Sequence, residues 1–173
     1  MSYAASAQYL TRYGLAETAG LLGVGDIETV LSAVIGGGLA PGAGADDIER
    51  ATLAASRLDV ALRMAENIMD GYLRAVVTLP LSAGDANAPT LSECCMALAR
   101  YALSSGADSM TEQRQKERDQ WMGWLRDVSS RRVQLIVSEG QPAPAHGAVR
   151  TGQARSAYDW ATHGMGTGYA GPQ

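Results

Sequence analysis

The feature that most constrains the fold of this chain is an apolar seam between residues 46 and 76. Its members recur at alternating steps of three and four, the spacing that lines one face of an α-helix. Acidic residues at 46 and 47 favour a helix start, and charged residues occupy the other faces. The seam comprises Ile48, Ala51, Ala55, Leu58, Leu62, Ala65, Met69, Tyr72 and Val76. The pattern predicts one long amphipathic helix, ending between residues 73 and 76, that needs other helices to cover it.

Shorter helices are predicted before this long one. The segments are residues 7–13, 15–22 and 27–35, followed by a glycine-rich loop over 36–45. Ser6 and Asp26 are candidate N-caps, because their side-chain oxygens can accept from the free backbone N–H groups of a first turn. Gly14 suits the left-handed conformation that ends a helix. We therefore expect a cluster of short helices packed against the long one.

Two further helices are predicted after the long one. Thr90, with Glu93 three positions on, forms a capping box for a helix that closes near residue 104. Thr111 or Glu112 begins a highly charged helix that reaches Val128. The apolar stripe of this last helix comprises Trp121, Trp124, Leu125 and Val128. We expect the helices to share one core made of Leu58, Leu62, Met69, Tyr72, Leu98, Tyr101, Trp124 and Leu125.

The C-terminal part of the sequence has a different character. Residues 133–137 form a β-prone run that allows one short edge strand. From residue 140 onward small residues and proline dominate, a composition that cannot bury enough apolar surface to fold alone. The sequence thus predicts an all-α fold, a small helical bundle built on the long helix. Its domain covers residues 1–137, with a helix-loop insertion at about 24–45, and residues 138–173 form an extended or partner-ordered tail.

The charge is unevenly distributed along the chain. The net charge of −4 argues against general nucleic-acid binding, which depends on clustered basic side chains. Residues 1–70 hold nine acidic residues against four arginines, whereas residues 111–132 hold six basic residues against four acidic ones. Such polarity suits head-to-tail contacts between subunits. The candidate interface residues are Arg118, Arg126, Arg131 and Arg132, with the tail aromatics Tyr158, Trp160 and Tyr169 as anchors for a partner.

No pattern in the sequence indicates catalysis or cofactor binding. Cys94 and Cys95 are adjacent, so on a helix they point about 100° apart and read as small buried residues. His146 and His163 have no carboxylate or cysteine at ligand spacing. The run GTGYAG at 166–171 matches dinucleotide-binding spacing but lacks a preceding strand and a following helix. We expect no enzymatic activity, no cofactor or metal, and no membrane span.

Several segments, in order, resemble the Mu-like phage head-tail connector (adaptor) family, whose members pair a long helix with shorter ones. The segments are YLTRYG at 9–14, AENIMDGYL at 65–73, LPL at 79–81, PTL at 89–91, ALARYAL at 97–103 and WLRDV at 124–128. The resemblance covers about residues 7–22 and 46–137. The chain departs from the family pattern in the extra helix and loop at 24–45 and in its longer tail.

The resemblance implies a structural virion protein of the neck, made in the host cytoplasm. It implies a head-completion protein that forms a homo-oligomeric ring of twelve subunits on the portal protein and joins the head to a tail-side connector or tail terminator protein. DNA would pass through the ring lumen without sequence-specific recognition. The alternative is a small helical DNA-packaging accessory or regulatory protein that binds nucleic acid through its basic helix at 112–132; the acidic total counts against it.

Overall fold

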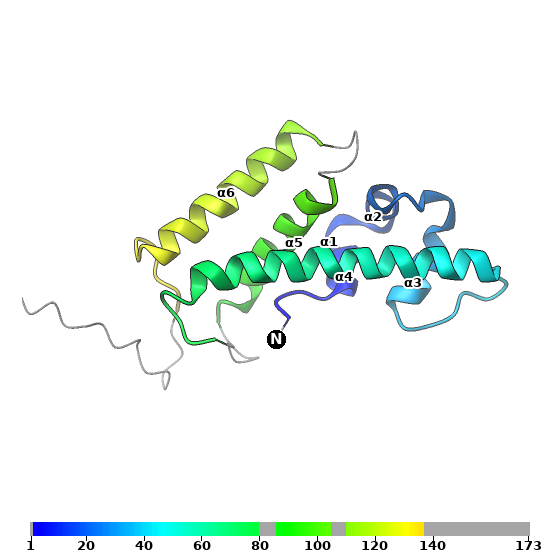
Figure 1. The fold of residues 1–173 in the computed structure, drawn as a ribbon, viewed down its shortest axis with the longest axis horizontal. Helices are drawn as coiled ribbons and strands as arrows, with labels where there is room; N and C mark the ends of the chain where they lie inside the picture. Colours follow the sequence, from blue (N-terminus) through cyan, green and yellow to red (C-terminus); the bar gives the residue numbers. More distant parts are fainter. Residues whose placement is uncertain (1, 80–85, 105–109, 137–173) are drawn as a thin grey trace, which may run out of the picture.

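A computed structural model describes residues 2–79, 86–104 and 110–136, which form six α-helices and one short 3-10 turn (Figure 1). The elements are α1 (Ser6–Tyr13), α2 (Leu15–Leu22), η1 (Gly25–Ile27), α3 (Glu28–Ile35), α4 (Ala45–Leu73), α5 (Ala88–Ser104) and α6 (Glu112–Ser129). These residues contain no β-strand, so the predicted all-α class is confirmed.

The long helix predicted from the apolar seam is α4, and it organises the bundle. It runs for 29 residues across the whole molecule and contacts α5, α3, α6, α1 and α2 (Figure 1). Its buried side chains are Ala51, Ala54, Leu58, Ala61, Leu62, Ala65, Met69 and Leu73. Four of these are alanines, and such small side chains let the neighbouring helices approach closely. The bundle is therefore built around α4, as the seam predicts.

Helix α5 supplies the other half of the core. Leu91, Cys94, Cys95 and Leu98 of α5 are buried against α4, together with Leu125 of α6. Burial raises the pKa of both cysteine thiols to about 12. The interpretation of the two cysteines as small buried core residues is therefore confirmed.

The predicted core is correct for most of its members. Leu58, Leu62, Met69, Leu98 and Leu125 are buried, and Tyr72 and Trp124 are half-buried against the same cluster. Tyr101 is also half-buried, but it is not among the side chains packed against this cluster; the guanidinium of Arg118 lies over its ring, 5.0 Å from the ring centroid. Its predicted place in the shared core was therefore wrong, since the helical spacing does not show that an arginine of α6 covers the position.

Three of the predicted helix starts differ in the structure. Ser6 lies inside α1, where its hydroxyl donates to Asp59, and the free N–H of Ala5 is bound instead by the Gln8 side chain at 2.9 Å. Asp26 lies in η1 and pairs with Arg50. The helix predicted to be capped by Thr90 starts at Ala88, two residues before Thr90, so Thr90 lies inside its first turn.

The start of α6 agrees with the sequence. Thr111 is the N-cap, and its side-chain oxygen accepts a hydrogen bond of 3.3 Å from the backbone N–H of Arg114. This is the arrangement expected of a threonine in front of a charged helix. The prediction that Thr111 or Glu112 opens this helix is confirmed.

The described part of the β-prone run, residues 133–136, forms no strand. The side-chain amide of Asn87 donates to the carbonyl of Ile136 at 2.7 Å and accepts from its N–H at 3.0 Å. One asparagine thus supplies both hydrogen bonds that a neighbouring strand would have given. The predicted tail, residues 138–173, lies outside the described residues.

The insertion at about 24–45 belongs to the folded core. Val30 and Leu31 of α3 are buried, and α3 packs against α4. The loop that follows α3 carries Leu39, whose side chain is 78% exposed. The division into a domain at 1–137 and a tail at 138–173 stays a prediction.

Candidate functional site

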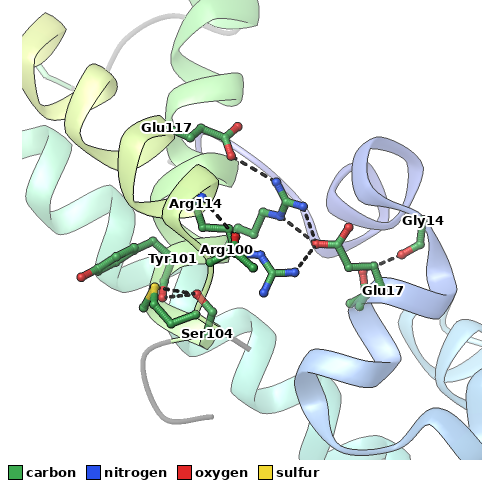
Figure 2. A network of polar contacts seen from close by, with 10 residues as sticks. Gly14, Glu17, Arg100, Tyr101, Ser104, Arg114 and Glu117 are labelled. Atoms are coloured by element: carbon green, nitrogen blue, oxygen red, sulfur yellow. Dashed lines mark hydrogen bonds and ion pairs between the residues drawn. The ribbon is translucent and has the colours of Figure 1, made fainter. Parts of the chain in front are cut away.

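A cluster of charged side chains links helices α2, α5 and α6 (Figure 2). One carboxylate oxygen of Glu17 accepts from the Arg100 guanidinium at 2.6 and 2.8 Å and from Arg114 at 3.0 Å. Arg100 also pairs with Glu117 at 3.1 Å. Only 17% of the Arg100 side chain and 13% of the Arg114 side chain are exposed. Two of the arginines are thus used inside the subunit.

The same arginine covers two stacked tyrosines. The Arg100 guanidinium lies 4.5 Å from the ring centroid of Tyr13, and the rings of Tyr13 and Tyr9 are 4.9 Å apart. Burial disfavours the phenolate and raises the pKa of Tyr13 to about 12. Burial, the largest single effect, would lower the pKa of Arg100, but the hydrogen bonds to Glu17 and the negative charges of Glu17 and Glu117 together outweigh it and raise the pKa. With the two tyrosines, the cluster joins α1, α2, α5 and α6, and its role is to stabilise the packing of these helices.

Two of the four candidate interface arginines lie on α6, and the other two lie in the turn after it. Arg118, in the middle of the helix, pairs with Asp119 at 2.7 Å and covers Tyr101. Arg126 is exposed and lies in the last turn of α6. Arg131, at φ 62°, and Arg132, 3.5 Å from Asp127, follow it in the turn after the helix. The other candidates, Tyr158, Trp160 and Tyr169, lie outside the described residues.

Three of these arginines form what we call the basic end: Arg126, Arg131 and Arg132. The guanidinium of Arg131 lies 3.5 Å from the carbonyl of Ala75, which places this end beside the C-terminus of α4. All three residues are exposed. Figure 1 shows the ends of α6 and α4 together at the left of the molecule.

The opposite end of α4 carries what we call the acidic end: Asp26, Glu28, Asp46 and Asp47. Both carboxylate oxygens of Asp26 accept from the Arg50 guanidinium at 2.9 Å, which joins η1 to the first turns of α4. These hydrogen bonds hold the pKa of Asp26 below its usual value. Because α4 has 29 residues, the two ends lie about 44 Å apart. The charge polarity of the sequence is thus a polarity in space.

A second feature of α4 is an exposed apolar surface, which we call the α4 stripe: Leu53, Val60, Met64 and Ile68. These side chains are 60%, 47%, 54% and 43% exposed. Steps of seven, four and four residues place them along one side of the helix, away from the buried seam. A groove runs beside the stripe, lined also by Ser56, Arg57, Ala61 and by Ala102 and Leu103 of α5.

Sequence reasoning missed this stripe. It assigned α4 a single apolar face, although the spacing of Leu53, Val60, Met64 and Ile68 is itself a helical signal. None of the described helices is long and apolar enough to cross a membrane. The described residues also contain no group of three or more histidine, cysteine, aspartate or glutamate side chains placed to hold a metal ion.

Comparison with known proteins identifies a family. The family model described as Bacteriophage Mu, Gp36 matches residues 3–152 of this chain. The match extends through every described helix and into the residues beyond them. No curated protein and no solved structure matches the chain.

Proposed function

Because the chain belongs to the Bacteriophage Mu Gp36 family, we propose that this phage protein is a structural component of the virion neck that works without catalysis. In this proposal it forms a homo-oligomeric ring on the portal protein and links the capsid to a tail-side connector or tail terminator protein. The ring has twelve subunits, the number that the connector resemblance implies. Its mechanism is binding, through one interface repeated around the ring.

The observation that carries the proposal is the polarity of the charged ends. The acidic end and the basic end lie at opposite ends of α4, about 44 Å apart. A closed ring needs heterologous contacts, in which one patch of a subunit meets a different patch of the next. Opposite charges on two separate patches favour that kind of contact and disfavour contact between like patches. The described domain therefore has the electrostatic character of a head-to-tail building block.

The alternative, nucleic-acid binding through the helix at 112–132, has less support. Of its basic residues, Arg114 is bonded to Glu17, Lys116 pairs with Glu112, and Arg118 pairs with Asp119. Phosphate binding would have to displace these carboxylates, which lowers the gain from each contact. The helix therefore presents mixed charge to solvent and lacks a continuous basic face.

Electron microscopy of the purified protein, alone and mixed with its cognate portal, tests the proposal. We expect rings on the portal, whether or not the free protein is already assembled. The variant Arg126→Glu/Arg132→Glu should keep its circular dichroism spectrum and lose ring formation, most clearly at low salt where screening is weakest. The matched control is Lys116→Glu, which changes an exposed charge on the same helix away from the basic end. Normal rings from the double variant would contradict the proposed role of the charged ends.

A further inference from the structure

The α4 stripe is a concentrated apolar surface. Four of the seven exposed large hydrophobic side chains among the described residues belong to it, and the others lie at Leu39, Val133 and Ile136. In Figure 1 the middle of α4 lies in front, with no other helix crossing over it. Single exposed apolar residues are ordinary, whereas a continuous row of them marks a contact surface.

The one charged residue within the row is turned away from it. The guanidinium of Arg57 donates to the carbonyl of Leu22 at 3.0 Å, which directs the charge back onto the same subunit. The aliphatic stem of Arg57 then lines the groove beside Val60 and Met64. The row of apolar side chains is therefore interrupted only by Arg57, whose guanidinium is engaged by the carbonyl of Leu22.

We propose that the α4 stripe binds the α4 stripe of a second copy of this chain, as an antiparallel pair with a two-fold axis close to Val60. In such a pair, residues whose numbers sum to about 121 face each other. Leu53 then packs against Ile68 of the partner subunit, and Val60 packs near the same residue of the partner. A helix face of this kind is self-complementary, because the axis lies at the midpoint of the stripe.

Charge at the two ends of the stripe selects the antiparallel direction. Glu49 of α4 and Arg74, the residue that directly follows this helix, are exposed and lie 25 residues apart. Arg74 keeps helical backbone angles, φ −54° and ψ −24°, so helical periodicity places both residues on the same side of the helix within about 20°. Neither forms an ion pair with another described residue. In the antiparallel pair, Glu49 lies within about 3 Å of Arg74 of the partner subunit, measured along the helix axis. The two-fold symmetry repeats this contact, so the pair has two such contacts between opposite charges. Parallel pairing would instead place like charges together.

This pair is separate from the ring interface proposed above. A two-fold contact is closed after two subunits and cannot extend into a ring. The antiparallel pair is thus a state of the free protein, formed by the side of α4, whereas the ring contact uses the acidic and basic ends. The proposal of the antiparallel pair can therefore be refuted while the proposal of the ring stands, and the reverse is also true.

Sedimentation velocity of the full chain at rising concentration tests the pairing. We expect a monomer-dimer equilibrium, and Met64→Glu should weaken it about tenfold or more, since a carboxylate would be buried in the apolar contact. Thr52→Glu, on the same helix but off the stripe, is the matched control and should change nothing. A monomer at every concentration would overturn the proposal, including the case in which residues 137–173 cover the stripe. So would a dimer that Met64→Glu leaves intact.

A charge exchange tests the direction of pairing without altering the apolar contact. Glu49→Arg and Arg74→Glu should each weaken the dimer by several-fold, and the double variant should restore it. Glu112→Arg, an exposed exchange on α6, is the control. If the double variant is as weak as the sum of the singles, the antiparallel register is wrong.

A cysteine near the axis gives a geometric test. Val60→Cys should form an intersubunit disulfide on mild oxidation, whereas Leu39→Cys, on the loop after α3, should not. The native Cys94 and Cys95 are both 0% exposed and do not compete. Equal cross-linking at the two positions would mean random collision and would overturn the inference.

Discussion

Glu17 of α2 and Arg100 of α5 lie 83 residues apart in the sequence and are joined by hydrogen bonds of 2.6 and 2.8 Å. The same carboxylate also binds Arg114 of α6, so one acidic side chain holds three helices (Figure 2). We expect Arg100→Met to lower the free energy of unfolding by about 1–3 kcal/mol, because it leaves Glu17 and Glu117 partly buried with fewer partners. Urea-induced unfolding measures this change in the free energy of unfolding. Lys116→Met, which breaks an exposed pair, should cost less than about 0.5 kcal/mol.

The contact between α4 and α5 depends on Leu62, which is 3% exposed. Leu62→Ala should lower the free energy of unfolding by about 2–5 kcal/mol, the usual cost of a cavity in a packed helical core. Leu53→Ala removes an equal side chain from the exposed stripe. In dilute solution it should change stability by about 0.5 kcal/mol or less. Equal effects of the two variants would contradict the assignment of the buried and exposed faces of α4.

The buried cysteines predict a loss of stability at alkaline pH. Burial raises the pKa of Cys94 and of Cys95 to about 12, from an ordinary value of 9.0, because the thiolate is disfavoured in the core. As the pH rises, the unfolded chain therefore releases these protons before the folded protein does. The contribution of the two thiols to stability is fully present below pH 9 and is lost as the pH rises from 9 toward 12. Chemical denaturation between pH 8 and 10 measures the fall. It should be shallower in Cys94→Ala/Cys95→Ala, and thiol reagents should modify the wild-type protein only after unfolding.

Asn87 replaces a strand partner for Ile136. Asn87→Ala removes both of the hydrogen bonds that hold this backbone, at a cost of about 1–2 kcal/mol. We expect new protease cleavage within residues 133–136 and no change in the helical circular dichroism signal. The control Asn67→Ala alters an exposed amide on α4. If cleavage in this segment is the same in both variants, the Asn87 contact does not anchor it.

The helices of this fold are largely predictable from the sequence because their signals are local. The seam on α4 extends over many turns, and Thr111 caps α6 from the adjacent position. Ser6 shows where local reasoning fails. Its hydroxyl is bound by Asp59, 53 residues later in the chain, and that contact exists only once α1 rests on α4. Helix caps can be reassigned by tertiary contacts that no short window of sequence contains.

The candidate surfaces were predictable only in part. The basic residues at 126, 131 and 132 do gather at one end, because a helix and the turn after it keep sequence neighbours together. Arg118, the fourth candidate arginine, does not join them, because it lies about two turns earlier on α6, where it pairs with Asp119 and covers Tyr101 of α5. The α4 stripe was missed for a related reason. Which of two apolar rows on one helix is buried depends on the placement of α5 and α3, which periodicity does not report.

The most direct test of the central claim is electron microscopy of the full-length protein mixed with its cognate portal, at low and at moderate salt. The polarity of the charged ends predicts a closed ring of this chain seated on the portal, with the basic end of each subunit against the acidic end of the next. It also predicts that Arg126→Glu/Arg132→Glu leaves the portal bare while Lys116→Glu does not. Portals that stay bare with the wild-type protein, under conditions where the portal itself is intact, would contradict the assignment of this protein to a neck ring.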